Sequence, residues 1–172
     1  MTAFDTRQGW IEEIVTLHQP GLIRYAHGHL GDLEQARDVV QDTFLRLCKQ
    51  APDDVVGHVK PWLYTVCRRR CLDVLKKEKR MVPLSDTQSG TMAGTEHGPS
   101  KALENLEACG QAAALLNDLS HSQQEAIRLK VQHELSYREI SEVMGISMSN
   151  VGYLLHEGIR KLRRQWQLQN AI

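Results

Sequence analysis

The sequence predicts an all-α protein built from two small helical domains that a flexible linker joins. Strand patterns are weak throughout, since β-branched residues never alternate with polar ones for long. Residues 81–100 concentrate Pro, Gly, Ser and Thr and lack apolar periodicity, which is typical of a linker. The chain has 172 residues and is 41% hydrophobic, enough for two packed cores. We therefore expect domains at 1–80 and 101–172, separated by a linker at 81–100.

Start and stop signals divide each domain into helices. Gly31-Asp32 separates the first two expected helices, and the run Ala51-Pro52-Asp53-Asp54 ends the second. Before the linker, helices are expected over about 7–29, 33–50 and 58–79. After the linker, they are expected over 101–117, 121–133, 136–144 and 148–166.

Composition excludes several classes of protein. The 21 basic and 21 acidic residues cancel, which excludes a uniformly basic nucleic-acid coat. No apolar run approaches the ~18 residues that span a bilayer, and the first ten residues lack the apolar region of a signal peptide. The four cysteines form no Cys-x-x-Cys pair. We expect a reduced cytoplasmic protein without a membrane span.

The charge is unevenly distributed. Residues 60–80 contain eight basic and two acidic residues, whereas residues 1–59 contain five basic and nine acidic residues. On a helical wheel, an apolar face of Val59, Leu63, Val66, Cys67 and Val74 lies opposite Arg68, Arg69, Lys76, Lys79 and Arg80. A solvated helix face explains this stripe as well as a site for a phosphate backbone does.

Three other residues of the basic segment have competing interpretations. Arg70 falls toward the apolar side, where an ion pair with Asp73, three residues later, is expected. Trp62 and Tyr64 fit the core, but an aromatic ring beside a positive stripe can also stack on an unpaired base.

The segment Leu135–Ser147 predicts a helix-turn-helix. Ser136 and Glu139 have the spacing of a capping box, and Gly145 suits a turn that requires a positive φ. Ser147 can cap the second helix, and the small Ser141 suits a close approach between the two helices. A generic helical hairpin is the alternative.

The helix after this turn has two distinct faces. We expect a buried face of Val151, Leu154, Leu155, Ile159, Leu162 and Trp166. The other face carries Ser149, Tyr153, His156, Arg160 and Arg164. In a recognition helix, Ser149, Asn150 and Tyr153 could hydrogen-bond to bases, and Asn suits adenine. Gly152 and Gly158 would each reduce helix stability by about 1 kcal/mol relative to Ala.

Three segments together resemble the extracytoplasmic-function sigma factors of bacterial RNA polymerase. Residues 38–47 (DVVQDTFLRL) resemble the helix that binds core polymerase. Residues 60–77 (KPWLYTVCRRRCLDVLKK) resemble the helix that melts the promoter and reads its minus-10 element. Leu119-Ser120, Gln123–Glu125, 135–140 and Gly145-Ile146-Ser147 resemble the domain that reads the minus-35 element.

This resemblance implies an alternative transcription initiation factor without catalytic residues, cofactor or metal. It implies that the first domain binds the clamp of the polymerase large subunit and that the second reads DNA while resting on the flap. The residues implied for core binding are Asp38, Gln41, Asp42 and Phe44. Those implied for minus-10 DNA are Asp53, Asp54, His58, Lys60, Trp62, Arg68, Arg69, Lys76 and Lys77. Those implied for minus-35 DNA are Ser147, Ser149, Asn150, Tyr153, His156, Arg160, Lys161 and Arg164.

The resemblance also implies a loop near Asp53–His58 that captures a flipped base, and an anti-sigma factor that sequesters the chain. Glu157 could accept a hydrogen bond from a cytosine amino group or point away from DNA. Two rival functions differ in class. One is a stand-alone helix-turn-helix regulator that binds a palindrome as a dimer. The other is a metal or redox protein that uses Cys67 and Cys71, although no neighbouring His has ligand spacing.

Overall fold

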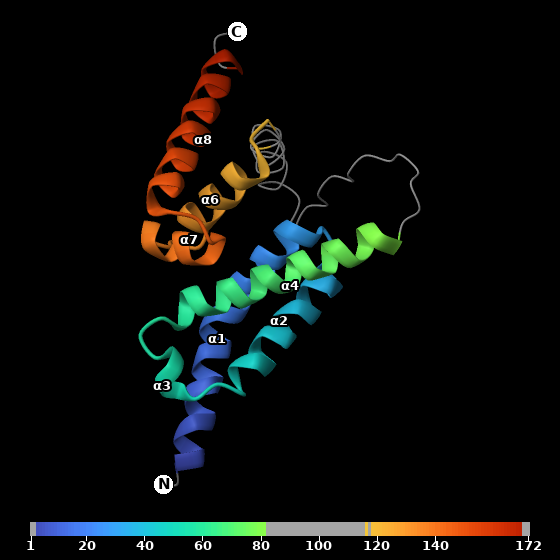
Figure 1. Cartoon of the computed structure of the whole chain (residues 1–172), viewed down its shortest axis with the longest axis vertical. Helices are drawn as coiled ribbons and strands as arrows, with labels where there is room; N and C mark the ends of the chain where they lie inside the picture. The colour runs from blue at the N-terminus through green and yellow to red at the C-terminus, as the bar shows by residue number, and fades with distance from the viewer. Residues whose placement is uncertain (1–2, 82–115, 117, 170–172) are drawn as a thin grey trace, which may run out of the picture. The chain divides into compact units, whose positions relative to one another are not determined.

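A computed structural model describes residues 3–81, 116 and 118–169, and every element in this part of the chain is helical. The chain divides into two compact units, each described separately below (Figure 1). The prediction of an all-α fold with two helical domains is confirmed. The linker expected at 81–100 lies outside the described residues except for Met81, and so does the helix expected at 101–117 except for Leu116.

The first unit contains α1 (Ala3–Leu30), α2 (Leu33–Leu47), α3 (Pro52–Val55) and α4 (Val59–Met81). Helices α1, α2 and α4 pack against one another in all three pairs (Figure 1). Gly31 adopts a φ of 72° where α1 ends, and the Asp32 carboxylate caps α2 by accepting from the Gln35 N–H at 2.8 Å. These two residues separate the helices as expected, because glycine tolerates positive φ and Asp is a favoured cap.

Two expectations for this unit were wrong. Helix α2 ends at Leu47 rather than at residue 50, and the expected loop at 53–58 begins with the short helix α3. Pro52 occupies the first turn of α3, where its missing N–H has no consequence for the helix. Asp53 and Asp54 follow in the same turn, where carboxylates interact favourably with the helix dipole.

The buried face of α4 is centred differently from the expected one. Leu63 and Cys67 are buried as expected, but Val59, Val66 and Val74 are only half-buried. The other buried residues of α4, besides Leu63 and Cys67, are Pro61, Tyr64 and Cys71. The reason is that α4 packs against both α1 and α2, so its buried arc is set by two neighbours rather than by one apolar stripe.

The second unit contains α6 (His121–Val131), α7 (Tyr137–Met144) and α8 (Met148–Gln169). Leu129, Leu135, Ile140 and Val151 are fully buried and form its core. Gly158 lies where α6 and α8 approach closely, since a Cβ placed there would be 2.8 Å from Ile127 Cδ1.

The expected buried face of α8 is only partly correct. Val151 and Leu155 are buried and Leu154 and Leu162 half-buried, but Ile159 and Trp166 are 44% and 56% exposed. These two side chains instead border an apolar groove of about 430 Å³ between α6 and α8, together with Leu116, Ile127, Val131 and Leu162.

Candidate polymerase and promoter surfaces

The four residues predicted to bind core polymerase lie on α2 but do not share one surface. Gln41 is exposed, Phe44 is 8% exposed, and both border a groove of about 430 Å³ that α1 and α2 form with Val15, Gln19, Ile23, Arg37, Leu45 and Cys48. Leu45 is 53% exposed, which adds apolar surface beside them. Asp38 is exposed to solvent, whereas Asp42 is half-buried and turns toward α4.

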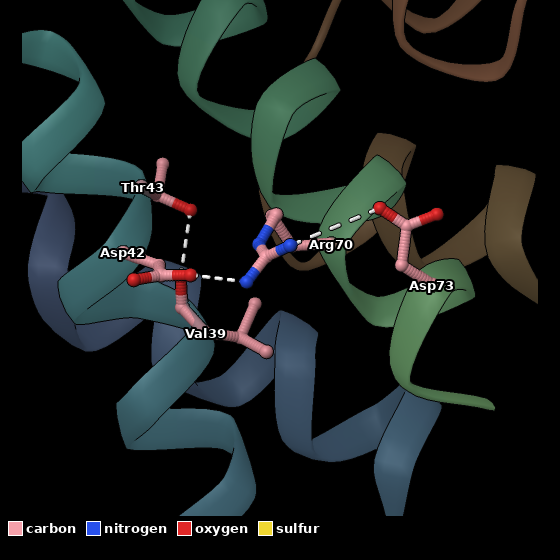
Figure 2. Close-up of polar contacts among 5 residues, drawn as sticks. All are labelled: Val39, Asp42, Thr43, Arg70 and Asp73. Carbon is pink, nitrogen blue, oxygen red and sulfur yellow. Dashed lines mark hydrogen bonds and ion pairs between the residues drawn. The ribbon is translucent and has the colours of Figure 1, made fainter. Parts of the chain in front are cut away.

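The Asp42 carboxylate forms an ion pair with Arg70, which connects α2 to α4 (Figure 2). Arg70 Nη2 donates to Asp42 Oδ2, and Arg70 Nη1 lies 3.9 Å from Asp73 Oδ2. The expected pair with Asp73 is therefore confirmed, but sequence analysis missed the shorter contact with Asp42. A separation of 28 residues leaves no local spacing that could have indicated it.

Beneath this ion pair, the centre of the first unit contains several polar groups. The Thr43 hydroxyl donates to the Val39 carbonyl at 2.8 Å (Figure 2). Cys67 and Cys71 are fully buried, and the hydrogen bond between their thiols, together with burial, raises the pKa of the Cys67 thiol well above its usual value. The two cysteines are therefore small core residues. Among residues 3–81, 116 and 118–169, no three His, Cys, Asp or Glu side chains gather as metal ligands would.

Tyr64 is also a core residue rather than a base-stacking one. It is 3% exposed and its ring meets that of Tyr25 edge to face, with centroids 5.2 Å apart. Burial raises the pKa of the Tyr64 phenol far above its ordinary value. Trp62 is half-buried, so part of its ring remains at the surface.

The cations predicted for minus-10 DNA follow α4 along its length. Arg69, Lys76 and Lys77 are exposed, as are Lys79 and Arg80 beyond them. Arg68 and Lys60 are half-buried. Lys60 lies close enough to His18 on α1 to affect it: burial, and secondarily the Lys60 charge, lower the pKa of the His18 imidazole. The exposed cations lie in two groups on this helix, Arg69 near its middle and Lys76, Lys77, Lys79 and Arg80 near its end, with the exposed Asp73 and Glu78 among them.

The segment around α3 presents acidic and apolar side chains to solvent. Asp53, Asp54 and His58 are exposed, and Val56 is 58% exposed. Gly57 has a φ of 90°, which lets the chain turn back into α4. Sequence analysis missed Val56, although an exposed apolar residue beside a glycine turn is a recognisable signal.

The turn between α7 and α8 has the geometry of a helix-turn-helix. Ser136 and Glu139 form the expected capping box, with Glu139 Oε2 accepting from the Ser136 N–H at 2.7 Å. Gly145 is left-handed with a φ of 68°, and Ser147 Oγ accepts from the Asn150 N–H at 3.2 Å. The Ser141 hydroxyl donates to the Ile146 carbonyl at 2.5 Å, which fixes the turn.

All eight residues predicted for minus-35 DNA are exposed. They are Ser147, Ser149, Asn150, Tyr153, His156, Arg160, Lys161 and Arg164. Arg160 Nη2 donates to Glu157 Oε2 at 2.5 Å, so Glu157 neutralises one of the three Lys and Arg side chains in this set.

Comparisons with known proteins agree with both units. A family model of Sigma-70 region 2 matches residues 14–81, and one of Sigma-70, region 4 matches residues 110–162. The ECF RNA polymerase sigma factor SigL of Mycobacterium tuberculosis is 34% identical over 151 residues, which cover 85% of this chain and 82% of SigL. The chain belongs to the extracytoplasmic-function (ECF) sigma factor family. ECF RNA polymerase sigma factor SigM of Bacillus subtilis is 28% identical and covers 89% of the chain and 93% of SigM.

Solved structures share the fold of this sigma factor. The sigma factor RpoE of Bartonella quintana, solved with the anti-sigma factor NepR, has a TM-score of 0.66 at 21% identity and covers 91% of this chain and 96% of that one. CnrH, solved with the cytosolic domain of CnrY, has a TM-score of 0.63 at 21% identity, with 94% and 90% coverage. The prediction of an alternative transcription initiation factor is confirmed by the family, and the stand-alone regulator is not favoured. None of the described helices is long and apolar enough to cross a bilayer.

Proposed function

We propose that this ECF sigma factor binds core RNA polymerase mainly through α2, and that it selects promoters through two separate DNA surfaces. The α2 residues proposed to bind core polymerase are Asp38, Gln41, Asp42 and Phe44, which lie on more than one face of the helix. The minus-10 surface comprises the α3 segment with Asp53, Asp54 and His58, and the basic residues Lys60, Arg68, Arg69, Lys76 and Lys77 with Trp62. The minus-35 surface is the exposed face of α8 listed above.

One observation carries the assignment of the second DNA surface. The left-handed turn at Gly145 and the Ser147 cap present the start of α8 as a recognition helix presents its first turns to a major groove. Ser149, Asn150 and Tyr153 are exposed on that start and carry the hydrogen-bonding groups that read base edges. Lys161 and Arg164 follow further along, where they suit phosphates.

The first surface is suited to melted DNA. The cations of α4 would hold the phosphate backbone, whereas the acidic and apolar side chains around α3 suit a single base rather than a phosphate. Unstacking a base costs a few kcal/mol, and capture of that base in a protein site would offset part of this cost.

Run-off transcription tests the proposed function directly. Purified chain with core polymerase should start transcription at discrete sites on genomic fragments, while core alone or chain alone should not. The absence of discrete starts would overturn the proposal. A palindromic footprint produced by the chain without polymerase would instead support a stand-alone regulator.

An anti-sigma factor is the second partner we propose. Two of the solved proteins similar to this chain were captured with other proteins, RpoE with the anti-sigma factor NepR and CnrH with the cytosolic domain of CnrY. The expected partner would compete with core polymerase, so adding it should reduce run-off transcription and excess core should restore it. Inhibition that excess core does not relieve would contradict this mode of action. The proposed activity belongs to the bacterial cytoplasm and involves no catalytic step by this chain.

A further inference from the structure

Arg7 connects the first turns of α1 to the segment that leads from α2 into α3. Its Nη2 donates to the Cys48 carbonyl at 2.8 Å and to the Gln50 carbonyl at 2.8 Å, across 41 and 43 residues of sequence. Carbonyls just beyond a helix C-terminus lack intrahelical partners, and a cation there also interacts favourably with the helix dipole. One guanidinium therefore satisfies two carbonyls in the four residues between α2 and α3.

The start of α3 is also held by backbone bonds, from the Asp54 N–H to the Ala51 carbonyl at 3.1 Å and from the Val56 N–H to the Pro52 carbonyl at 2.9 Å. Ala51 precedes the helix and provides no side-chain cap. Two further backbone bonds, from the Lys49 N–H to the Arg46 carbonyl at 3.1 Å and from the Gln50 N–H to the Leu47 carbonyl at 3.0 Å, follow the end of α2.

The other end of the segment is fixed by burial. Val55 is 1% exposed, and its carbonyl accepts from the His58 N–H at 3.1 Å. Between this anchor and the Arg7 contact, the chain presents the exposed Asp53 and Asp54. The position of these carboxylates therefore depends on Val55 at one end and on Arg7 at the other.

We propose that Arg7 is a positioning residue for minus-10 recognition. It fixes the start of α3, and through it the exposed side chains of 53–58 that would capture a flipped promoter base. Arg7 itself does not contact DNA in this proposal. The inference rests on the proposed function, because Arg7 affects promoter recognition only if the α3 segment binds a base.

The test compares DNA with and without the captured base. The probes are fork-junction duplexes of a promoter mapped by run-off transcription, with the minus-10 non-template strand unpaired and either intact or abasic at one position. For wild-type holoenzyme, the ratio of the two dissociation constants measures base capture. In Arg7→Met, we expect this ratio to fall at least about fivefold, because a charge-assisted anchor of α3 is lost. Affinity for core polymerase should stay within about twofold.

Two further variants make the test specific. Arg24→Met removes an exposed arginine of the same helix and should leave the ratio unchanged. Arg7→Lys keeps the charge but cannot present the same guanidinium, so its ratio should fall less than that of Arg7→Met. If Arg7→Met does not fold, as judged by circular dichroism and core binding, Arg7→Lys is measured against Arg24→Met in its place.

The outcomes separate the inference from the proposed function. A wild-type ratio of one at every minus-10 position would mean that the α3 segment reads no base, and both proposals for it would fail. A wild-type preference that Arg7→Met retains in full would overturn only the role of Arg7. If Arg7→Met weakened holoenzyme binding to the intact and abasic probes equally, the role of Arg7 would also be overturned, because a residue with a merely structural role would have that effect.

Discussion

Reversing the charge of Asp42 is the most informative perturbation of the first unit, since Asp42 has two proposed roles. It is assigned to core polymerase, and it forms the ion pair with Arg70 that connects α2 to α4 (Figure 2). Asp42→Arg is expected to abolish polymerase binding by charge reversal. The same change would also place two guanidinium groups side by side, so loss of binding alone would not distinguish the roles.

The structure sets the size of the effect on stability. Two like charges about 4 Å apart repel by about 1 kcal/mol in water and about 4 kcal/mol at an effective dielectric constant near 20. The Asp42 and Arg70 side chains are 43% and 31% exposed, so solvent screens the pair and the lower part of this range applies. We expect Asp42→Arg to lower the free energy of unfolding of the first unit by about 1–2 kcal/mol.

The charge-swapped double variant separates the two roles. Asp42→Arg combined with Arg70→Asp restores an ion pair of reversed polarity, and we expect a coupling energy of about 1 kcal/mol in the double-mutant cycle. It should recover stability but not polymerase binding, since the surface charge of α2 stays reversed. Asp73→Asn is the matched control: its 3.9 Å contact with Arg70 should contribute less than about 0.5 kcal/mol.

Urea unfolding followed by tryptophan fluorescence measures these values. In a Trp166→Phe background, the two remaining tryptophans, Trp10 and Trp62, both lie in the first unit and report its unfolding alone. Core binding is measured by co-purification. A coupling energy near zero would refute the role of the ion pair in packing α4 on α2. Recovery of core binding by the swapped variant would refute a direct contact of the Asp42 charge with polymerase.

Three further predictions concern other parts of the chain. Gly152→Ala should raise the free energy of unfolding of the second unit by up to about 1 kcal/mol. Gly158→Ala should have a free energy of unfolding about 1–3 kcal/mol below that of Gly152→Ala, because the added Cβ would contact Ile127 of α6. Equal urea midpoints for the two variants would contradict this. Because folding lowers the pKa of His18, its contribution to stability is present above pH 6.5 and is lost as the pH falls below that value. In His18→Gln, the free energy of unfolding of the first unit should therefore depend less on pH between pH 7 and 5. An unchanged dependence on pH would refute this. Asn150→Ala should change the minus-35 preference at one base by about 1–3 kcal/mol, whereas Arg164→Ala should weaken holoenzyme binding to all promoters alike. Holoenzyme binding to promoters altered base by base measures both effects. Uniform effects from both variants would contradict the assignment.

The parts of the structure that sequence predicted are those set by neighbours along the chain. The capping box of Ser136 and Glu139, the left-handed turn at Gly145 and the cap at Ser147 each depend on residues three or four positions apart. Their residue types and spacing therefore determine the local backbone. The exposed face of α8 follows from the same periodicity.

The parts that sequence missed depend on distant residues. The contacts of Arg7 with the segment after α2 and of Arg70 with Asp42 cross 28 residues or more, and no periodicity encodes them. The exposure of Trp166 likewise depends on how far α6 covers α8 rather than on its place on an apolar stripe. Helix α3 was missed because four residues are too few for a periodic signal.

These long-range contacts change what the charge pattern means. Residues 60–80 contain eight basic side chains, but Arg70 is held by two carboxylates and serves the packing of the first unit. Arg160 is likewise paired with Glu157 in the second unit. Each phosphate contact contributes about one to the slope of the logarithm of the DNA-binding constant against the logarithm of salt concentration, and a cation that is paired within the protein does not add this contribution. Each unit therefore offers duplex DNA less charge than the sequence suggests, which agrees with the proposal that core polymerase holds the two proposed DNA surfaces on one promoter.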